Sequence, residues 1–508
     1  MSPNVANKAV RNFLFSGGRL AISMCATLCT SAIIARRLGP ANMGVYGYAM
    51  WIVGTLGILA NIGLPGALTK YVAEYIGSGD TATAVRVGKR LLLTQLAVAA
   101  GVSGLTACFM LVRSPYRNII GLAAVMLFAQ ALQQSLTSAL AGIQRFDRLA
   151  LISLYVALAS VVSVGVAALL HAGVMGMLWA TLTGLAVSIG LYYRDINKFL
   201  FKLPPNPSHS LPVTPDPFRR IRKFSLTVSY ILLVDAIVWQ RSEVLFLKGY
   251  STVAQIAFYT LAYSIASKLA DIAGTFSTTL MPLYSESYGR NGLRDIGVVF
   301  INALKYLQML MVPLCLLGVA VARPVAQLIY GPQFLAVALP LQILLIALSV
   351  TTIGVVISPL LYGIDKQSFI GKYGTAVAVL NIALDLILIP KYAAIGAATA
   401  NSAAQIAGVL GGAIYAVRCT GVTFPWRTTA AIYSAAAIAV APVAYLASHT
   451  HSRSGVAALI GSVAAAAVIY LGVLVAVREL GIQDIDILKR AILKKGSPAG
   501  TLEAVDPA

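Results

Sequence analysis

The longest segment without a charged residue, residues 149–193, reads LALISLYVALASVVSVGVAALLHAGVMGMLWATLTGLAVSIGLYY. An α-helix needs about 20 apolar residues to cross the hydrocarbon core of a bilayer. The segment is therefore long enough for two crossings. His171, Ala172 and Gly173 lie near its middle, where a turn between two helices is expected.

Uncharged windows of this kind recur along the whole chain. The protein has 508 residues, of which 58% are hydrophobic and 11% are charged, whereas a soluble domain carries about 25% charged residues. We predict an all-α polytopic membrane protein with fourteen spans, or with twelve if the charge-interrupted seventh and eighth do not form. No room remains for a large soluble domain. The other long uncharged windows are residues 38–69, 118–144, 324–364 and 392–417.

The net charge of +21 predicts topology rather than a nucleic-acid partner. No RNA-binding motif or zinc-finger spacing accompanies the charge. Cytoplasmic loops of membrane proteins collect Lys and Arg. When the spans alternate from a cytoplasmic N-terminus, most of the 38 Lys and Arg fall on the cytoplasmic side. We therefore expect both termini in the cytoplasm.

Two halves of the sequence repeat each other around a basic, proline-rich segment. Residues 173–180 match residues 393–400, with an offset of 220 between Gly176 and Gly396. Parallel repeats of six helices bind substrate between the halves in transporters. The predicted divisions are an N-lobe (1–193, spans 1–6), a linker (194–223), a C-lobe (224–417, spans 7–12), two more spans (418–477) and an amphipathic basic tail (478–508).

Eight ionisable residues interrupt the apolar segments. A charged residue in hydrocarbon costs about 2.5–3.5 kcal/mol on insertion scales, so it usually marks a pathway or a lined cavity. The eight residues are Arg19, Asp235, Arg241, Glu243, Lys268, Asp271, Lys305 and Asp385.

The candidates for binding an anionic substrate in a cavity are the four cations Arg19, Arg241, Lys268 and Lys305. A guanidinium group fits phosphate oxygens in a planar fork, and lysine acts as a point charge. Arg19 and Lys305 lie about 10 Å into their helices, so both can instead extend to the headgroups. Arg241 can instead form an interfacial ion pair with Glu243. Gln133, on the fourth span with Gln130 and Gln134, can contact a sugar or support helix packing.

The candidates for coupling transport to an ion gradient are Asp235, Asp271, Asp385 and Asn381. Asp385 lies near the middle of the eleventh span, one turn after Asn381 on the same face. A carboxylate there can take a proton or help to bind Na⁺, or it can lock two helices through a buried hydrogen bond. Asp271 can instead pair with Lys268 at a spacing of i,i+3.

Two motifs suggest a family. RRLGPANMGVY at residues 36–46, followed by Gly63-Leu64 and Ala73-Glu74, resembles the "ARxLGPxxxGxY…GL…AE" opening of polysaccharide-transport flippases. Residues 381–390 and 395–400 resemble their "N…LIPxxGxxGAAxAT" element, in which Asp385 departs from the usual Asn or apolar residue. From about residue 10 to 477 the chain is similar to the O-antigen (Wzx-type) flippases. They belong to the multidrug/oligosaccharidyl-lipid/polysaccharide exporter superfamily.

The resemblance implies two six-helix lobes that form a V, as in multidrug exporters (MATE-like), around a cavity that opens to one side at a time. It also implies a location in the bacterial cytoplasmic membrane. The implied substrate is an undecaprenyl-pyrophosphate-linked oligosaccharide, moved to the outer leaflet for O-antigen (lipopolysaccharide), capsule or exopolysaccharide synthesis. The implied partners are this polyprenyl-linked glycan, membrane lipid, a glycan polymerase and glycosyltransferases.

Other functions remain open at this stage. A lipid II flippase would have a similar basic cavity. A multidrug/cation antiporter of the same superfamily would have an acidic, aromatic one. A membrane glycan polymerase usually needs a sizeable external loop with catalytic residues, and the external loops predicted here are short. No Walker A loop is present. We therefore expect a secondary transporter coupled to H⁺ or Na⁺, with no catalytic residue, cofactor or metal centre.

Overall fold

The structure, a computed structural model, describes residues 3–77, 79–113, 117–202, 217–239, 243–291, 296–364, 366–449, 453–477 and 479–480. These residues are helical throughout apart from short connections, which confirms the all-α prediction. The helices are α1 (Pro3–Asn61), α2 (Leu64–Gly77), α3 (Thr81–Arg113), α4 (Arg117–Gly142), α5 (Phe146–Leu169), α6 (Gly173–Ile196), η1 (Asn197–Phe201), α7 (Pro217–Trp239), α8 (Glu243–Tyr250), α9 (Val253–Asn291), α10 (Ile296–Tyr330), η3 (Pro332–Val337), α11 (Ala338–Thr351), α12 (Ile353–Gly363), α13 (Gln367–Thr420), α14 (Trp426–His449) and α15 (Arg453–Ala476).

Within the described residues, nine helices are long and apolar enough to cross a membrane. Two of these nine contain a sharp kink. Helix α1 has φ 70° and ψ 173° at Gly39, directly before Pro40, and α13 has φ 49° at Ala393. A positive φ breaks a right-handed helix, so each long helix has two arms. Helices α7 and α9, at the seventh and eighth predicted spans, are not among the nine, and the total of fourteen spans stays a prediction.

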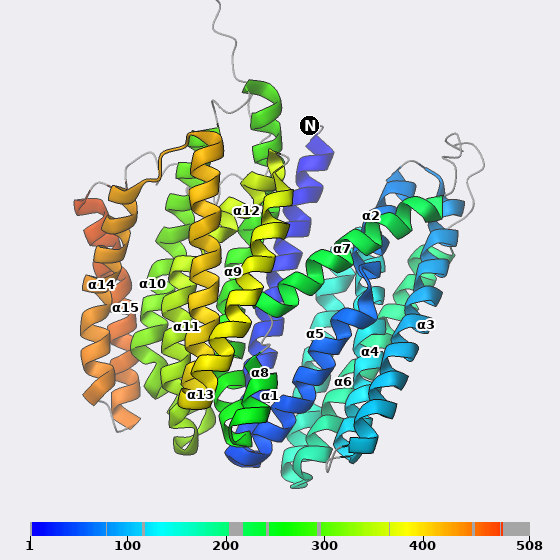
Figure 1. Cartoon of the computed structure of the whole chain (residues 1–508), viewed down its shortest axis with the longest axis horizontal. Coiled ribbons are helices and arrows are strands. Elements are labelled where there is room, and N and C mark those ends of the chain that lie inside the picture. The colour runs from blue at the N-terminus through cyan, green and yellow to red at the C-terminus, as the bar shows by residue number, and fades with distance from the viewer. Residues whose placement is uncertain are drawn as a thin grey trace, which may run out of the picture.

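The helices gather in two groups that lean together at one end (Figure 1). Helices α2–α6 form the right-hand lobe in this view, and α9–α15 form the left-hand lobe. The first arm of α1 (residues 3–38) lies between the lobes, and α7 runs obliquely from the right-hand lobe towards the centre. We call the end at which the chain starts the upper end, and the end at which α1 turns back the lower end.

One apolar cluster joins both lobes at the lower end. It contains Ile34 and Leu38 of α1, Val164 of α5, Leu247 of α8 and Tyr330 of α10, all buried. No comparable cluster joins the upper halves of the described helices. There, Leu68 of α2 belongs to a right-hand core, and Leu304 of α10 belongs to a separate left-hand core. Burial of apolar surface stabilises contact at about 25 cal/mol per Å², so the lower end is the closed end.

Two glycines bring the second arm of α1 (residues 40–61) against the start of α9. A Cβ atom on Gly44 would lie 1.8 Å from the carbonyl oxygen of Val253, and one on Gly47 would lie 2.9 Å from Oγ1 of Thr260. Small residues allow backbones to approach this closely in membrane helices. Nearby, Arg36 donates to the carbonyl of Ile329 at 2.8 Å and so caps the end of α10.

Helix α7 is attached to the right-hand lobe at its upper end. Arg220 pairs with Glu74 of α2 at 2.8 Å. The ammonium of Lys70 lies 4.6 Å from the ring centre of Phe224. Because the later part of α7 packs against α13 of the other lobe, this helix spans the gap between the upper halves.

Helices α14 and α15 pack on the outer side of α10 (Figure 1). Three polar contacts fix them there. Thr429 donates to Oε1 of the buried Gln308 at 3.0 Å, and Tyr433 donates to Oγ of Ser349 at 3.3 Å. Tyr470 donates to the carbonyl of Met309 at 2.9 Å.

Two ion pairs of different burial lie at the upper ends of α5 and α6. Arg148 binds Asp195 through Nε–Oδ2 at 2.7 Å and Nη2–Oδ1 at 3.1 Å, and the Asp195 side chain is only 2% exposed. Arg145 binds Asp147 at 2.9 Å, but these side chains are 37% and 41% exposed. The buried pair holds two helices together, whereas the exposed pair lies within one turn of chain.

Asp195→Ala should therefore lower the midpoint of thermal unfolding in detergent much more than Asp147→Ala. Asp195→Ala removes the two charge-assisted hydrogen bonds that join α5 to α6 and leaves Arg148, which is 25% exposed, without them. A hydrogen bond to a charged group contributes about 1.5–3 kcal/mol, whereas an exposed pair contributes about 0–1 kcal/mol. Equal losses for the two variants would show that the Arg148–Asp195 pair does not hold α5 to α6.

Candidate functional site

A cavity of about 280 Å³ lies between the first arm of α1 and helices α4, α5 and α6. Its walls show helical periodicity, because the lining positions of α1 and α5 recur every three or four residues. Most of the lining side chains are polar, and Arg19 is the one charged residue among them. The lining residues are Arg19, Ser23, Ala26, Thr27, Thr30, Ile34, Tyr46, Gln133, Ser153, Val156, Ala157, Ser160, Val164, Thr181 and Tyr192.

Arg19 has no hydrogen-bond or ion-pair partner among the described residues. Gln133 and Ser23 likewise make no side-chain hydrogen bond within the described part of the chain. Thr27 and Thr181 donate to carbonyls one turn earlier on their own helices, at 2.7 Å and 2.9 Å, so their oxygens can still accept. The cavity thus offers one guanidinium group, an amide and several hydroxyls to a ligand.

Two of the other three predicted cavity cations, Lys268 and Lys305, do not line this cavity. Lys268 pairs with Asp271 at 3.0 Å, as its i,i+3 spacing predicted, and its side chain is 27% exposed. The ammonium of Lys305 lies 5.7 Å from the ring centre of the adjacent Tyr306. Arg241 lies outside the described residues. A role in substrate binding for these three cations stays a prediction.

A second polar cluster is buried where α8, α9 and both arms of α13 meet. Its centre is Glu243, which is 0% exposed. Oε2 of Glu243 accepts from Tyr259 at 2.8 Å. Oε1 accepts from Asn401 at 2.7 Å and from Asn381 at 3.4 Å. A neutral hydroxyl and two amides therefore surround this carboxyl group.

Asp385 completes this cluster, one turn after Asn381. It is also 0% exposed, and neither of its carboxyl oxygens has a hydrogen-bond partner among the described residues. Asp385 is close enough to Glu243 to interact with it electrostatically. A buried carboxylate without a donor is costly, so it holds a proton or a cation instead. Oxygen ligands of this kind suit hard cations.

Asp385 and Asn381 thus lie together, as their spacing predicted, while Asp271 is at the surface with Lys268 and 45% exposed. The side chain of Asp235 lies outside the described residues. The alternative of an ion pair between Arg241 and Glu243 is not tested, because Arg241 lies outside the described residues, while Glu243 itself is fully buried. Sequence analysis also missed Tyr259 and Asn401. Asn401 has a usable signal, since it follows Asn381 in the same motif.

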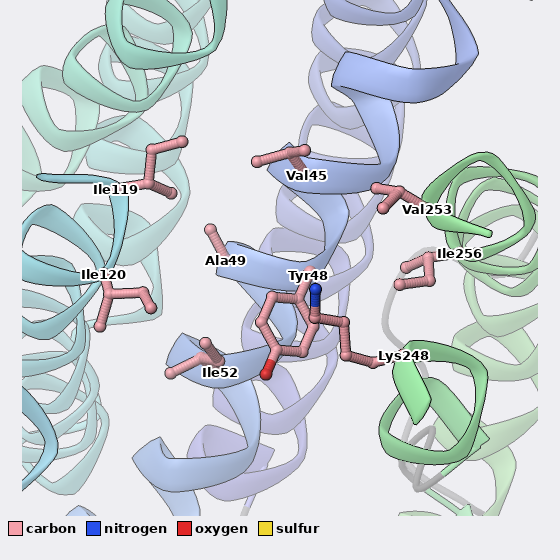
Figure 2. A pocket seen from close by; sticks show the side chains of 9 residues that line it. All are labelled: Val45, Tyr48, Ala49, Ile52, Ile119, Ile120, Lys248, Val253 and Ile256. Atoms are coloured by element: carbon pink, nitrogen blue, oxygen red, sulfur yellow. The ribbon is translucent and has the colours of Figure 1, made fainter. Parts of the chain in front are cut away.

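Lys248, the other cation near Glu243 in sequence, lies at the lower contact between the lobes. Figure 2 shows it beside Tyr48, with its ammonium 5.4 Å from the ring centre. Val45 and Ala49 of α1 lie between Ile120 of α4 and the start of α9 (Figure 2). The remaining space is about 10 Å³, which is at most room for one water molecule. The lower contact is therefore tightly packed.

The sequence also matches known proteins. A family model described as "Polysaccharide biosynthesis protein" matches residues 33–339, more than half of the chain. The chain belongs to this polysaccharide biosynthesis family. A second model, "Lipid II flippase MurJ", matches residues 268–465. The probable low-salt glycan biosynthesis flippase Agl15 of Haloferax volcanii is 21% identical over 377 residues, which cover 72% of this chain and 75% of that relative.

Solved structures show the same fold. Lipid II flippase MurJ in an inward closed conformation has a TM-score of 0.63 and 17% identity, covering 95% of this chain and 100% of that one. An inward-facing multidrug resistance MATE family transporter of the MOP superfamily has a TM-score of 0.58 and 18% identity, covering 80% and 99%. The predicted resemblance is confirmed. The chain is a multi-pass membrane protein of the polysaccharide-transport flippases in this superfamily, which are transporters rather than enzymes.

The cavity of this family member should be accessible to water. We expect Ser23→Cys to react with a membrane-impermeant thiol reagent, because thiols react as thiolates in water. Leu158→Cys is the matched control, since Leu158 is 57% exposed on α5 but does not line the cavity and should face lipid. Both variants are made after replacement of the five native cysteines. Equal labelling of the two positions would contradict a hydrated cavity.

Proposed function

We propose that this protein flips an undecaprenyl-pyrophosphate-linked oligosaccharide across the bacterial cytoplasmic membrane, for synthesis of O-antigen, capsule or exopolysaccharide. The coarser function, movement of a lipid-linked glycan, follows from the family and its relatives. The observation that carries the proposal is Arg19, an unpaired guanidinium group in a cavity lined by hydroxyls. A transported anionic headgroup would supply the missing partner.

The chemistry of the cavity fits such a headgroup. A guanidinium group forms two parallel hydrogen bonds with phosphate oxygens. Gln133 and Ser23 can exchange hydrogen bonds with sugar hydroxyls, because neither is engaged by another described side chain. The lipid tail can stay in the bilayer while only the head crosses. In this scheme Lys268, Lys305 and Arg241 act on the headgroup elsewhere along its path.

The distribution of charge supports a cytoplasmic upper end. Cations such as Lys70, Arg86, Lys89 and Arg90 occupy the upper ends of α2 and α3, and cytoplasmic loops are enriched in Lys and Arg. We therefore place both chain termini and the open side of the lobes in the cytoplasm, where lipid-linked glycans are assembled. Glycosyltransferases and a glycan polymerase would be the partners on either side of the transport step.

We propose that Asp385, Asn381 and Glu243 bind the coupling ion, either Na⁺ or a proton. A buried acidic group inside a membrane protein commonly belongs to an ion pathway. The carboxyl oxygens of Asp385, which have no hydrogen-bond partner among the described residues, provide ligands within a dry region. Because this cluster contacts both arms of α13, its occupancy can influence helix packing in the left-hand lobe.

A lipid II flippase is the second candidate function. It is favoured by the match of the MurJ family model to residues 268–465. Export of cationic drugs is disfavoured, because Arg19 lines the cavity and no acidic residue does. Deletion of the gene distinguishes the two glycan functions. Loss of lipid II transport stops cell-wall synthesis, whereas loss of surface-glycan transport need not stop it.

Deletion of the gene should trap lipid-linked repeat units on the cytoplasmic face and remove surface glycan. The wild-type chain should restore display, and Arg19→Ala should lose about 10- to 100-fold of transport, since a hydrogen bond to a charged group contributes about 1.5–3 kcal/mol. Lys268→Ala should also reduce flipping. The readouts are surface glycan and the yield of folded protein. Normal glycan display after deletion, with no second transporter present, would refute the proposal.

Asp385→Asn should remove the dependence of transport on the ion gradient, because an amide neither takes a proton nor carries charge to hold Na⁺. Transport into vesicles is measured with and without Na⁺ at fixed pH, and then across a pH gradient without Na⁺. Asp147→Asn is the control, since its carboxylate is 41% exposed near the start of α5, outside the cluster. A variant that keeps the wild-type dependence on both ions would exclude Asp385 from coupling.

A further inference from the structure

The first two turns of α9, Val253 to Thr260, contact two distant parts of the structure. At 100° per residue, Val253 and Thr260 lie within about 20° of each other around the helix, and Gln255 and Tyr259 lie on the opposite side. One face therefore meets the second arm of α1 at the lower contact, and the other meets the buried carboxyl cluster. The side chains and backbone of these two turns contact both α1 and the cluster directly.

On the cluster side, Tyr259 and Gln255 hold two separate elements. The side chain of Tyr259 is buried, and its hydroxyl donates to Oε2 of Glu243 at 2.8 Å. Oε1 of Gln255 accepts from the backbone N–H of Ala394 at 3.3 Å, directly after the kink at Ala393. The kink sets the angle between the arm of Asn381 and Asp385 and the arm of Asn401. The two side chains thus connect α9 to Glu243 and to the kink between the two arms of α13.

On the side of α9 that faces α1, the two helices are in close contact. The position of Gly44 has no room for a Cβ atom beside the carbonyl of Val253, and Gly47 is in contact with Thr260. Packed interfaces of this kind are bistable rather than continuously deformable. A small rotation or shift of α9 would therefore separate the lobes at the lower contact instead of stretching it.

We propose that the start of α9 transmits occupancy of the carboxyl cluster to the lower contact between the lobes, with Tyr259 as the positioning residue. The inference rests on the proposed function, with Na⁺ as the coupling ion. A Na⁺ ion bound by Asp385 attracts the oxygens of Glu243, and it competes with the Tyr259 hydroxyl for them. Release of Tyr259 lets α9 move, the contacts at Gly44 and Gly47 break, and the lower end opens.

The experiment measures Na⁺ binding and the lower contact separately. Ala49→Cys and Ile256→Cys, which line the same small space from α1 and α9, report closure through the yield of cross-linking in a chain without native cysteines. Binding of radioactive Na⁺ reports occupancy. In the otherwise wild-type chain, Na⁺ at fixed pH should shift the ratio of open to closed protein by about 5- to 150-fold, the usual range of coupling between sites.

Tyr259→Phe keeps the ring but removes the hydroxyl, so it should still bind Na⁺ while its cross-linking no longer responds. A purely structural role would lower folded yield without uncoupling the two readouts. An Na⁺ response of Tyr259→Phe equal to that of wild type would overturn the inference. Na⁺ binding without any change in cross-linking of the wild-type contact would also overturn it, leaving the proposed function intact. Absence of Asp385-dependent Na⁺ binding would overturn the inference and leave a proton as the coupling ion of the proposed function.

A second set of variants tests the far side of α9. Gly47→Ala should favour the open state with or without Na⁺, because its Cβ meets Oγ1 of Thr260. Thr260→Ala removes that atom and should restore closure and the Na⁺ response in the double variant. Gly54→Ala is the matched control, since nothing lies within 4 Å of its Cβ position. If Gly47→Ala closes and responds like Gly54→Ala, the proposed route through α9 is excluded.

Discussion

The shared apolar core at the lower end is the contact on which the rest of the structure depends. Ile34 and Leu38 of α1 pack there with residues of both lobes, while the upper halves keep separate cores. Because the lobes meet at one end only, the upper end can admit water and a headgroup between them. The kink at Gly39 makes this possible, since it returns the chain upwards within the closed region.

The two polar sites of this protein differ in how their charges are compensated. The Arg19 cavity offers a cation with no partner in the described part of the chain, beside hydroxyls that can still accept or donate. The Glu243 cluster offers carboxyl and amide oxygens with no cation among the described side chains. Among the described residues, the Arg19 cavity therefore lacks an anion, and the Glu243 cluster lacks a cation. This complementarity is what a transporter needs if it moves an anionic head and uses a cation gradient to do so.

Much of the fold could be predicted from the sequence, because membrane helices follow from uncharged windows such as residues 149–193 alone. Kinks were harder to predict. Gly39 before Pro40 carries a local signal, but Ala393 takes a positive φ that only tertiary packing can impose. The buried cluster was found in part, since the i,i+4 spacing of Asn381 and Asp385 fixes one face of one helix. Tyr259 comes from α9 and Asn401 from the other arm of α13, and the sequence pattern does not predict which separate segments meet.

The outer helix pair α14 and α15 shows why a twofold-repeated core alone would be poorly suited to lipid. Gln308 of α10 and Ser349 of α11 accept hydrogen bonds from Thr429 and Tyr433 of α14. Without this pair, an amide and a hydroxyl would face hydrocarbon, where an unsatisfied polar group costs several kcal/mol. The two additional helices therefore shield these polar groups from lipid. A shortened chain that ends after α13 would expose them and should self-associate through that surface.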